Sequence, residues 1–177
     1  NTYGPTGMET DSPVTITGIS GEASEMERVT LTIDMLSDNA NHVGDGGGLP
    51  ALIDGKVNTY YHTKWNAPVT TEAHYVQIKL NKPLKDLCFE YDARQSGVNN
   101  GGDVKAATIY GSMNGEFFES MGNEEFNLPT TNGGHATAKN NVSGKQAYNY
   151  IRFTPTARRD KDPLDYTVAG SAWGNMS

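Results

Sequence analysis

The sequence predicts an all-β domain, built as an antiparallel sandwich or barrel. Segments of alternating apolar and polar residues recur along the chain, as in Val29–Met35 and His74–Leu80, and each predicts a half-buried strand. The chain also holds 20 glycines and many asparagines, which indicates tight turns between short strands. No stretch shows convincing helical periodicity. Many short strands separated by turns are typical of antiparallel sandwiches and barrels.

The N-terminal part is predicted to be an arm ahead of the domain. Residues 1–13 are rich in turn-forming residues, and Val14–Ile19 alternates in a way that suits an edge strand. In Val29–Met35, apolar side chains alternate with Thr and Asp, which predicts the first strand of the domain. We therefore expect an arm or linker at residues 1–28 and a sandwich domain at residues 29–177.

The other predicted strands follow in order. Apolar residues occupy alternate positions of His74–Leu80 and again of Leu87–Tyr91, so each segment has one inward face. Asn114-Gly115 is a tight-turn pair followed by two phenylalanines, which predicts a hairpin. Further strands are expected in Val104–Ser112, Glu119–Leu128, Ala136–Asn140 and Tyr148–Thr154, with loops at Ser37–Gly48 and Ala157–Asp165.

Composition limits the classes of function. The 177 residues suffice for one large domain, or for one domain with an arm. The net charge of −7 argues against nucleic acid as the main partner, because phosphate binding needs a surplus of Lys and Arg on one face. No apolar run approaches the ~20 residues of a membrane span. The single cysteine, Cys88, excludes an internal disulfide and a CxxC zinc site, and we interpret it as a packed side chain.

The stretch Ala51–Trp65, ALIDGKVNTYYHTKW, carries the strongest indication of function. Asp54 and Thr59 offer hard oxygen ligands, and the glycine after Asp54 lets the chain fold back between them. That arrangement suits a Ca²⁺ loop in which backbone carbonyls supply the remaining ligands. His62 and Trp65 follow at once, so the loop would support a polar and aromatic surface. The alternative is a turn between two strands with a buried aromatic cluster.

These residues resemble the opening of discoidin-type domains, also called coagulation factor V/VIII C-type domains. Among them, family 32 carbohydrate-binding modules and the N-terminal domain of galactose oxidase are the most similar. The family pattern A-I-D-G-x-x-x-T-x-W-H-T matches this stretch, with Tyr61 where the family usually has Trp. Further blocks match in order at His74–Leu80, at Tyr91–Gln95 with Asn100-Gly101, at Val104–Phe118 and at Tyr150–Thr154. The resemblance implies an antiparallel jelly-roll β-sandwich of about eight strands, with a ligand site in the loops at one end.

The resemblance also implies a structural Ca²⁺. Matched by position, the ligands are the side chains of Asp54 and Thr59 and the carbonyls of Ala51, Lys56 and Thr59. The family adds a carbonyl and a Glu carboxylate from the last strand, where the nearest residues here are Gly174 and Asn175. The acidic ligand is therefore missing, and a site with one carboxylate should bind Ca²⁺ more weakly than a site with two.

A sugar site is implied by the same resemblance. Galactose-preferring members bind the hydroxyls with a His, an Arg and an Asn beside a Trp, and the matching residues are His62, Arg94, Asn100 and Trp65. A pyranose has hydroxyls at its rim and C–H groups on one face, so these residue types suit it. Each residue alone also has an ordinary structural role, and Asn99 is an alternative to Asn100. Tyr166 is a candidate for a second aromatic wall.

Together these features predict a non-catalytic carbohydrate-binding module for galactose-type sugars on extracellular glycans, with a structural Ca²⁺. We expect a monomeric, secreted or cell-surface bacterial module that is attached to other domains, binds a glycan or small sugar, and neither binds nucleic acid nor inserts into membranes. The alternative is a discoidin-like adhesion or protein-interaction domain without sugar binding.

A third possibility, a small hydrolase on a jelly roll, has less support. Glu90, Asp92, Asp103 and Glu116 are interpreted as solvated surface carboxylates. A retaining glycosidase needs two carboxyls about 5–5.5 Å apart, which a sequence does not reveal. No serine elbow, metal-binding His pair or phosphate-binding loop is found.

Overall fold

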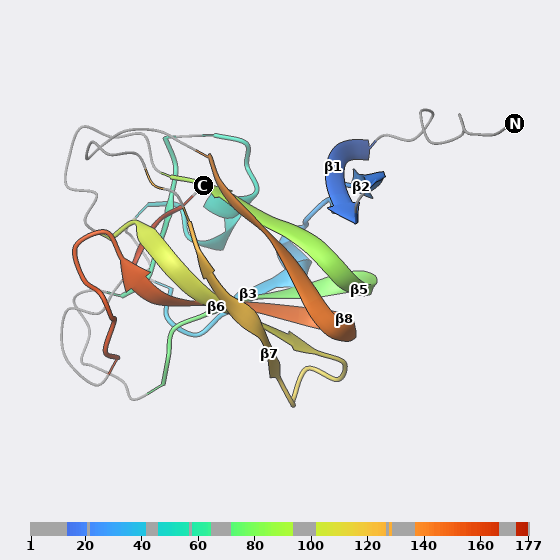
Figure 1. The fold of residues 1–177 in the computed structure, drawn as a ribbon. Helices are drawn as coiled ribbons and strands as arrows, with labels where there is room; N and C mark the ends of the chain where they lie inside the picture. Colours follow the sequence, from blue (N-terminus) through green and yellow to red (C-terminus); the bar gives the residue numbers. More distant parts are fainter. Residues whose placement is uncertain are drawn as a thin grey trace, which may run out of the picture. The chain divides into compact units, whose positions relative to one another are not determined.

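The protein is described here by a computed structural model with two compact units, Asn1–Leu31 and Thr32–Ser177 (Figure 1). The described residues are 14–20, 22–41, 46–56, 58–64, 72–93, 102–126, 128, 137–166 and 173–176. None of the helices in this described part has the length and apolarity needed to cross a membrane.

The N-terminal unit contains a β-hairpin. Strand β1 (Val14–Ser20) pairs antiparallel with β2 (Glu22–Glu27), and the register places Val14 opposite Glu27. The first strand lies where the alternating pattern predicted one. The second lies in a segment whose polar, acidic composition gave no indication of a strand.

The larger unit is built on a five-stranded antiparallel sheet with strand order β3-β5-β8-β6-β7. These strands are β3 (Leu36–Asp38), β5 (Val76–Asp92), β6 (Val104–Ser112), β7 (Glu119–Glu125) and β8 (Thr137–Arg158). The turn between β6 and β7 is fixed by Asn114, whose side-chain oxygen accepts hydrogen bonds from the backbone N–H groups of Glu116 and Phe117. The hairpin predicted from Asn114-Gly115 is therefore confirmed.

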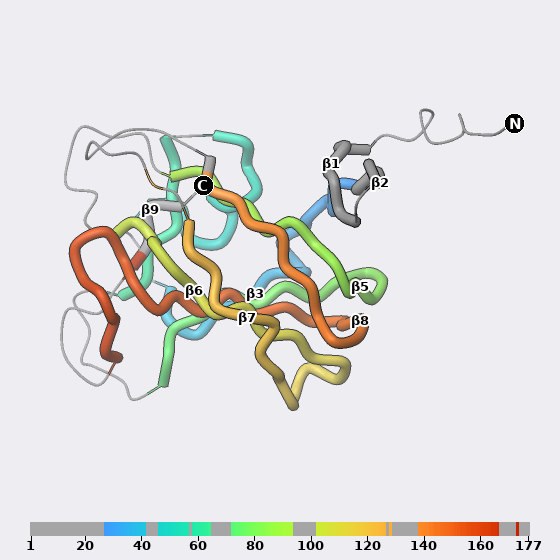
Figure 2. The backbone as a smooth tube through the Cα atoms, in the orientation of Figure 1, coloured from blue at the N-terminus to red at the C-terminus, as the bar shows by residue number. Residues whose placement is uncertain are grey.

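Strands β5 and β8 pair with each other twice, and this makes the sheet a sandwich. Residues 76–79 of β5 pair with 150–153 of β8, and residues 86–92 pair with 137–143. Between these two regions the register shifts, and Figures 1 and 2 show the paired strands turning back on themselves there. The two arms of the pair thus form two facing layers. The antiparallel sandwich predicted from the sequence is confirmed, with β5 and β8 contributing to both layers.

The hydrophobic core lies between these layers. Phe89, from one arm of β5, stacks on Phe153 of β8 with ring centroids 4.7 Å apart and planes 4° apart. The inward faces predicted for His74–Leu80 and Leu87–Tyr91 supply core residues or pack against the core. Its buried members include Val76, Tyr91, Val104, Ile109, Val142, Ile151 and Trp173.

A second, two-stranded sheet pairs residues far apart in the chain. Strand β4 (Tyr61–His62) runs antiparallel to β9 (Gly174–Met176), with Tyr61 opposite Met176 and His62 opposite Gly174. A 3-10 helix, η3 (Leu49–Leu52), precedes β4 and contains the buried Ala51. The C-terminal segment is therefore fixed beside the stretch that carries the predicted site.

The strand predicted at Val29–Met35 is wrong. Residues 33–35 form a 3-10 helix, η2 (Ile33–Met35), and the strand begins only at Leu36. Thr32 donates its hydroxyl to Asp34 Oδ1 at 2.6 Å, and the N–H of Met35 donates to Thr32 O, so local bonds replace a strand ladder. Val29 and Ile33 are 39% and 49% exposed, and of the apolar side of the alternation only Met35, at its end, is buried.

Candidate functional site

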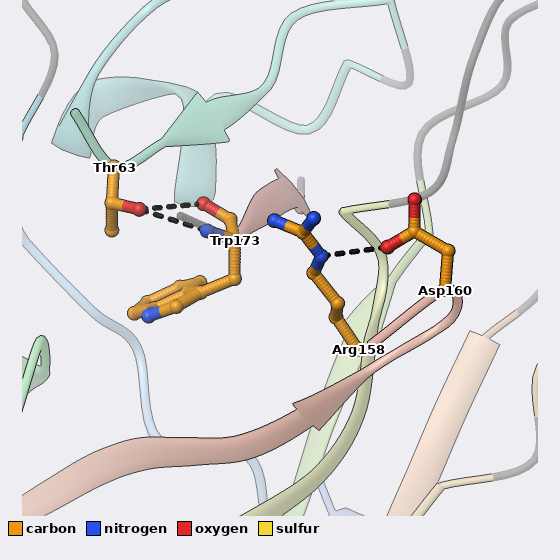
Figure 3. Close-up of polar contacts among 4 residues, drawn as sticks. All are labelled: Thr63, Arg158, Asp160 and Trp173. Atoms are coloured by element: carbon orange, nitrogen blue, oxygen red, sulfur yellow. Dashed lines mark hydrogen bonds and ion pairs between the residues drawn. The ribbon is translucent and has the colours of Figure 1, made fainter. Parts of the chain in front are cut away.

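The candidate site is anchored by Thr63, the residue after β4. Its backbone N–H and its hydroxyl both donate to the carbonyl of Trp173, at 2.9 and 3.0 Å, and the N–H of Trp173 donates back to the hydroxyl at 2.9 Å (Figure 3). Both residues are fully buried. The Trp173 ring lies 5.6 Å from Tyr61 and 5.9 Å from Phe153, centroid to centroid. Sequence reasoning missed Trp173, although a tryptophan in a polar, glycine-containing tail was an available signal.

The two predicted side-chain ligands for Ca²⁺ meet in one loop. Thr59 donates its hydroxyl to Asp54 Oδ2 at 2.6 Å, and the N–H of Lys56 donates to Asp54 Oδ1 at 2.9 Å. Gly55 has φ +71° and so supplies the left-handed turn that brings these groups together. The Thr59 bond, followed by the Lys56 bond, lowers the pKa of the exposed Asp54 carboxyl. The loop is therefore closed around an ionised carboxylate.

The side chains of this loop are of the kind that binds a hard cation, but they are few. Carboxylate and hydroxyl oxygens are the ligands that Ca²⁺ takes, and backbone carbonyls can add to them. Within the described residues, no group of three or more His, Cys, Asp or Glu side chains is placed to hold a metal. Gly174 and Asn175 lie in β9, which pairs with β4, the strand that follows the loop, and their role as ligands stays a prediction. Asp54 is thus the one carboxylate among the predicted ligands.

His62 has a defined ring orientation. Its Nδ1 lies 2.7 Å from the carbonyl oxygen of Thr63, and because a carbonyl only accepts, Nδ1 carries the proton. In the neutral ring, Nε2 is then the hydrogen-bond acceptor. The adjacent Tyr61 is buried and donates its hydroxyl to Asp38 Oδ2 at 2.7 Å, which fixes β4 to β3. Burial, and then the bond to Asp38, raise the pKa of Tyr61, so its hydroxyl keeps its proton.

The side chain of Tyr166 makes several contacts within the protein. Its hydroxyl donates to the carbonyl of Pro155 at 2.9 Å, and its ring lies 4.7 Å from that of His74. The ring also packs against the hydrophobic core. Burial raises the pKa of Tyr166. The hydroxyl is therefore engaged by the protein, while the role of the ring as an aromatic wall stays a prediction.

The remaining predicted sugar ligands, Trp65, Arg94 and Asn100, lie outside the described residues, as does the alternative Asn99. The described residues nearest to Arg94 and Asn100 in the chain are Ala93 and Gly102. Ala93 and the residue after Gly102, Asp103, are both fully buried.

The interpretation of Asp103 as a solvated carboxylate is wrong. The residue is fully buried, and Arg159 Nη2 lies 3.0 Å from its Oδ2. The N–H of Arg159 also donates to the Asp103 carbonyl at 2.8 Å. The partner comes from the predicted charged loop Ala157–Asp165, 56 residues away, which a local pattern does not reveal. That segment also holds Arg158, which ends β8 and pairs with Asp160 at 2.7 Å (Figure 3).

Comparison with known proteins finds one matching family and several solved structures of similar fold. The profile of the F5/8 type C domain matches residues 37–167. The solved structure of CpGH89CBM32-5 from Clostridium perfringens, in complex with GalNAc-β-1,3-galactose, is 23% identical, with a TM-score of 0.53 over 78% of this chain and 88% of that one. The family 32 module of NanJ from the same organism, in complex with galactose, is 18% identical, with a TM-score of 0.51 over 78% and 86%.

A third structure, the C-terminal domain of a chitobiase from Bacteroides fragilis, is 19% identical, with a TM-score of 0.54 over 83% of this chain and 95% of that one. Among curated proteins, none matches the chain. The solved structures share its fold.

Proposed function

The chain belongs to the F5/8 type C, or discoidin, family, and from that premise we propose that it is a non-catalytic module that binds galactose-type sugars. Two structural neighbours were solved in complex with galactose or with a galactose-containing disaccharide, which supports this class of ligand. One neighbour comes from a family 31 glycoside hydrolase and another is the C-terminal domain of a chitobiase, which supports an extracellular module attached to other domains of a longer protein.

The observation that carries the proposal is the placement of His62. The residue follows the Asp54–Thr59 loop directly, and the Thr63–Trp173 bonds hold the chain just beyond it. With Nδ1 held by a carbonyl, Nε2 is the ring nitrogen that would accept a hydrogen bond from a sugar hydroxyl. A ring fixed in this way loses little freedom on binding, which favours affinity for a small ligand.

The other roles follow from the chemistry of the side chains. Arg94 would donate to hydroxyl or ring oxygens through its planar fork, Asn100 would both donate and accept, and Trp65 would cover the C–H face. Two donors that meet at the axial hydroxyl of galactose would be left unpaired by an equatorial one. Such a site prefers galactose to its 4-epimer, glucose.

We also propose a structural Ca²⁺ at the Asp54 loop. Asp54 and Thr59 would hold the ion with their side chains, joined by carbonyls of Ala51, Lys56 and Thr59 and by groups of Gly174 and Asn175. When bound, the ion would supply positive charge that keeps the loop closed beneath His62. With one carboxylate in the set, we expect an affinity at the weak end of the range for protein Ca²⁺ sites.

The test is a calorimetric titration with galactose, N-acetylgalactosamine and glucose, with and without Ca²⁺. We expect saturable binding of the first two sugars, weaker binding of glucose, and loss of binding in His62→Ala and Arg94→Ala. Lys85→Ala, which changes an exposed residue at the bend of β5, serves as the control and should bind like the wild type. Heat from neither galactose nor N-acetylgalactosamine in the folded protein would contradict the proposal and favour the adhesion alternative.

A further inference from the structure

We propose a second binding site, centred on Arg152 on the outer face of the five-stranded sheet, which takes the carboxylate of an acidic sugar. It involves none of the residues assigned to galactose recognition. The two proposed sites can therefore be tested independently of each other.

Arg152 lies in the middle of the sheet and points away from the core. On β8 its neighbours in sequence, Ile151 and Phe153, are buried, so the side chain of Arg152 lies on the opposite face. The strand register places it between Gln77 on β5 and Tyr110 on β6. The guanidinium thus lies on the face of the sheet, and the predicted galactose site lies in the loops at one end of the sandwich.

The guanidinium is held rigidly. Its Cζ lies 4.0 Å from the ring centroid of Tyr75 and 3.8 Å from that of Phe118. Its Nε donates to Gln77 Oε1 at 2.7 Å, which fixes the rotation of the group about its stem. Stacking on aromatic faces and a hydrogen bond at Nε leave the outer edge of an arginine oriented before a ligand arrives.

The charge of Arg152 has no carboxylate partner within the part of the chain that the structure describes. The ion pairs Lys105–Asp162, Arg158–Asp160 and Arg159–Asp103 involve other residues. Arg152 is partly exposed, and the terminal nitrogens of its guanidinium carry further N–H groups. Their parallel N–H groups match the two oxygens of a carboxylate, which is the strongest common pairing of an arginine. Exposed Lys79 lies further along the same face of β5, where its charge also acts on the Asp34 carboxyl.

The surroundings favour a sugar over a bare anion. Tyr110 and Tyr150 lie on the same face as Arg152 and are partly exposed, so their rings and hydroxyls can meet the C–H face and hydroxyls of a pyranose. The turn that carries Phe118 is fixed against this face, since a Cβ on Gly115 would lie 3.0 Å from the Tyr150 ring. Phe117, at the rim, is 78% exposed. A uronic acid combines the carboxylate and the pyranose that this surface suits.

The decisive experiment compares methyl β-glucuronide with methyl β-glucoside, which has a neutral hydroxymethyl group in place of the carboxylate. The full chain is titrated with each while the Arg152 Nε–H resonance is followed by NMR and the heat by calorimetry. We expect a saturable shift with the glucuronide alone, weakened by added salt because partly exposed charges are screened. Absence of a shift with the glucuronide would overturn the proposal. Equal affinity for acetate would also overturn it, because the site would then recognise an anion and no sugar.

A pair of matched variants locates the site. Arg152→Lys keeps the charge but loses the planar fork, and we expect glucuronide binding to weaken by about tenfold or more while galactose binding is unchanged. Arg158→Lys alters an arginine that already has Asp160 as its partner, and it should bind glucuronide like the wild type. Equal losses in both variants would contradict the assignment to Arg152. If Arg152→Lys does not fold, the Nε–H titration of the wild type decides by itself.

Discussion

The hydroxyl of Thr63 donates to the carbonyl of Trp173 and accepts from its N–H, across 110 residues of sequence. With the backbone N–H of Thr63 added, three hydrogen bonds join two fully buried residues. Thr63→Val keeps the shape of the side chain but leaves the buried Trp173 N–H without this acceptor. We expect a loss of about 1–3 kcal/mol in the free energy of unfolding, measured with denaturant. Thr156→Val, which removes a longer bond of 3.3 Å to Asn123, is the control and should cost less.

The buried ring of His74 should make stability depend on pH. Burial lowers its pKa below the usual value of 6.5, and the charge of Glu72 opposes this only in part. Below about pH 6.5 an unfolded chain binds a proton that the folded ring resists, so stability should be full above this pH and fall as the pH drops through and below it. Denaturant midpoints between pH 5 and 7.5 measure the effect.

The variant His74→Phe removes the titrating group and keeps a ring against Tyr166. Its stability should fall less than that of the wild type over the same range of pH. A parallel pH profile for both proteins would show that another group is responsible.

Loss of Arg159 from the buried pair with Asp103 should cost more stability than loss of Lys105 from its exposed pair with Asp162. Arg159→Met leaves a fully buried carboxylate without its guanidinium, and we expect a loss of about 3–5 kcal/mol in the free energy of unfolding. Lys105→Met removes an exposed ion pair with Asp162, for which the expected loss is below about 1 kcal/mol. Urea denaturation of both variants makes the comparison, and similar small losses would contradict the importance of the buried pair.

Gly111 leaves room for the ring of Tyr148. A Cβ at position 111 would lie 2.3 Å from that ring, so Gly111→Ala must displace a fully packed aromatic side chain. We expect a loss of about 1–3 kcal/mol in the free energy of unfolding. In a double-mutant cycle with Tyr148→Leu the two losses should be less than additive, because the smaller side chain makes room for the methyl group. Strict additivity would show that the ring is not the obstacle.

Removal of Ca²⁺ tests the Asp54 loop apart from sugar binding. A chelator should lower the melting temperature of the wild type, because a ligand that binds the folded state alone stabilises it. Asp54→Asn should melt at the same temperature with and without Ca²⁺, while Asp86→Asn, an exposed carboxylate at the bend of β5, should keep the wild-type response. A wild type that is insensitive to millimolar Ca²⁺ would count against the metal.

The local sequence was sufficient to predict a strand where that strand has one buried face. Segments such as His74–Leu80 and Leu87–Tyr91 alternate because the core lies on one side, and that pattern is visible without any partner. The same reasoning failed at Val29–Met35, where the alternation is present but Val29 and Ile33 remain exposed. Hydrophobic periodicity indicates which face would be buried, and only the tertiary structure decides whether a core meets that face.

Long-range partners account for what the sequence did not reveal. Asp103 looks like a surface carboxylate until Arg159 is placed beside it, and Trp173 looks like part of a polar tail until Thr63 binds it. The Asp54–Thr59 contact was predictable because both residues lie in one short loop. Trp65, Arg94 and Asn100 stay predictions, since they lie outside the described residues.

The pairing of β4 with β9 affects the order in which the protein folds during its synthesis. The strand that carries His62 finds its partner only when residues 174–176 have been synthesised. Contacts between such distant segments are slow to form, because a long loop must close before they stabilise anything. On the ribosome, the sheet beside the Asp54–Thr59 loop would therefore form late, after most of the layered core has been synthesised.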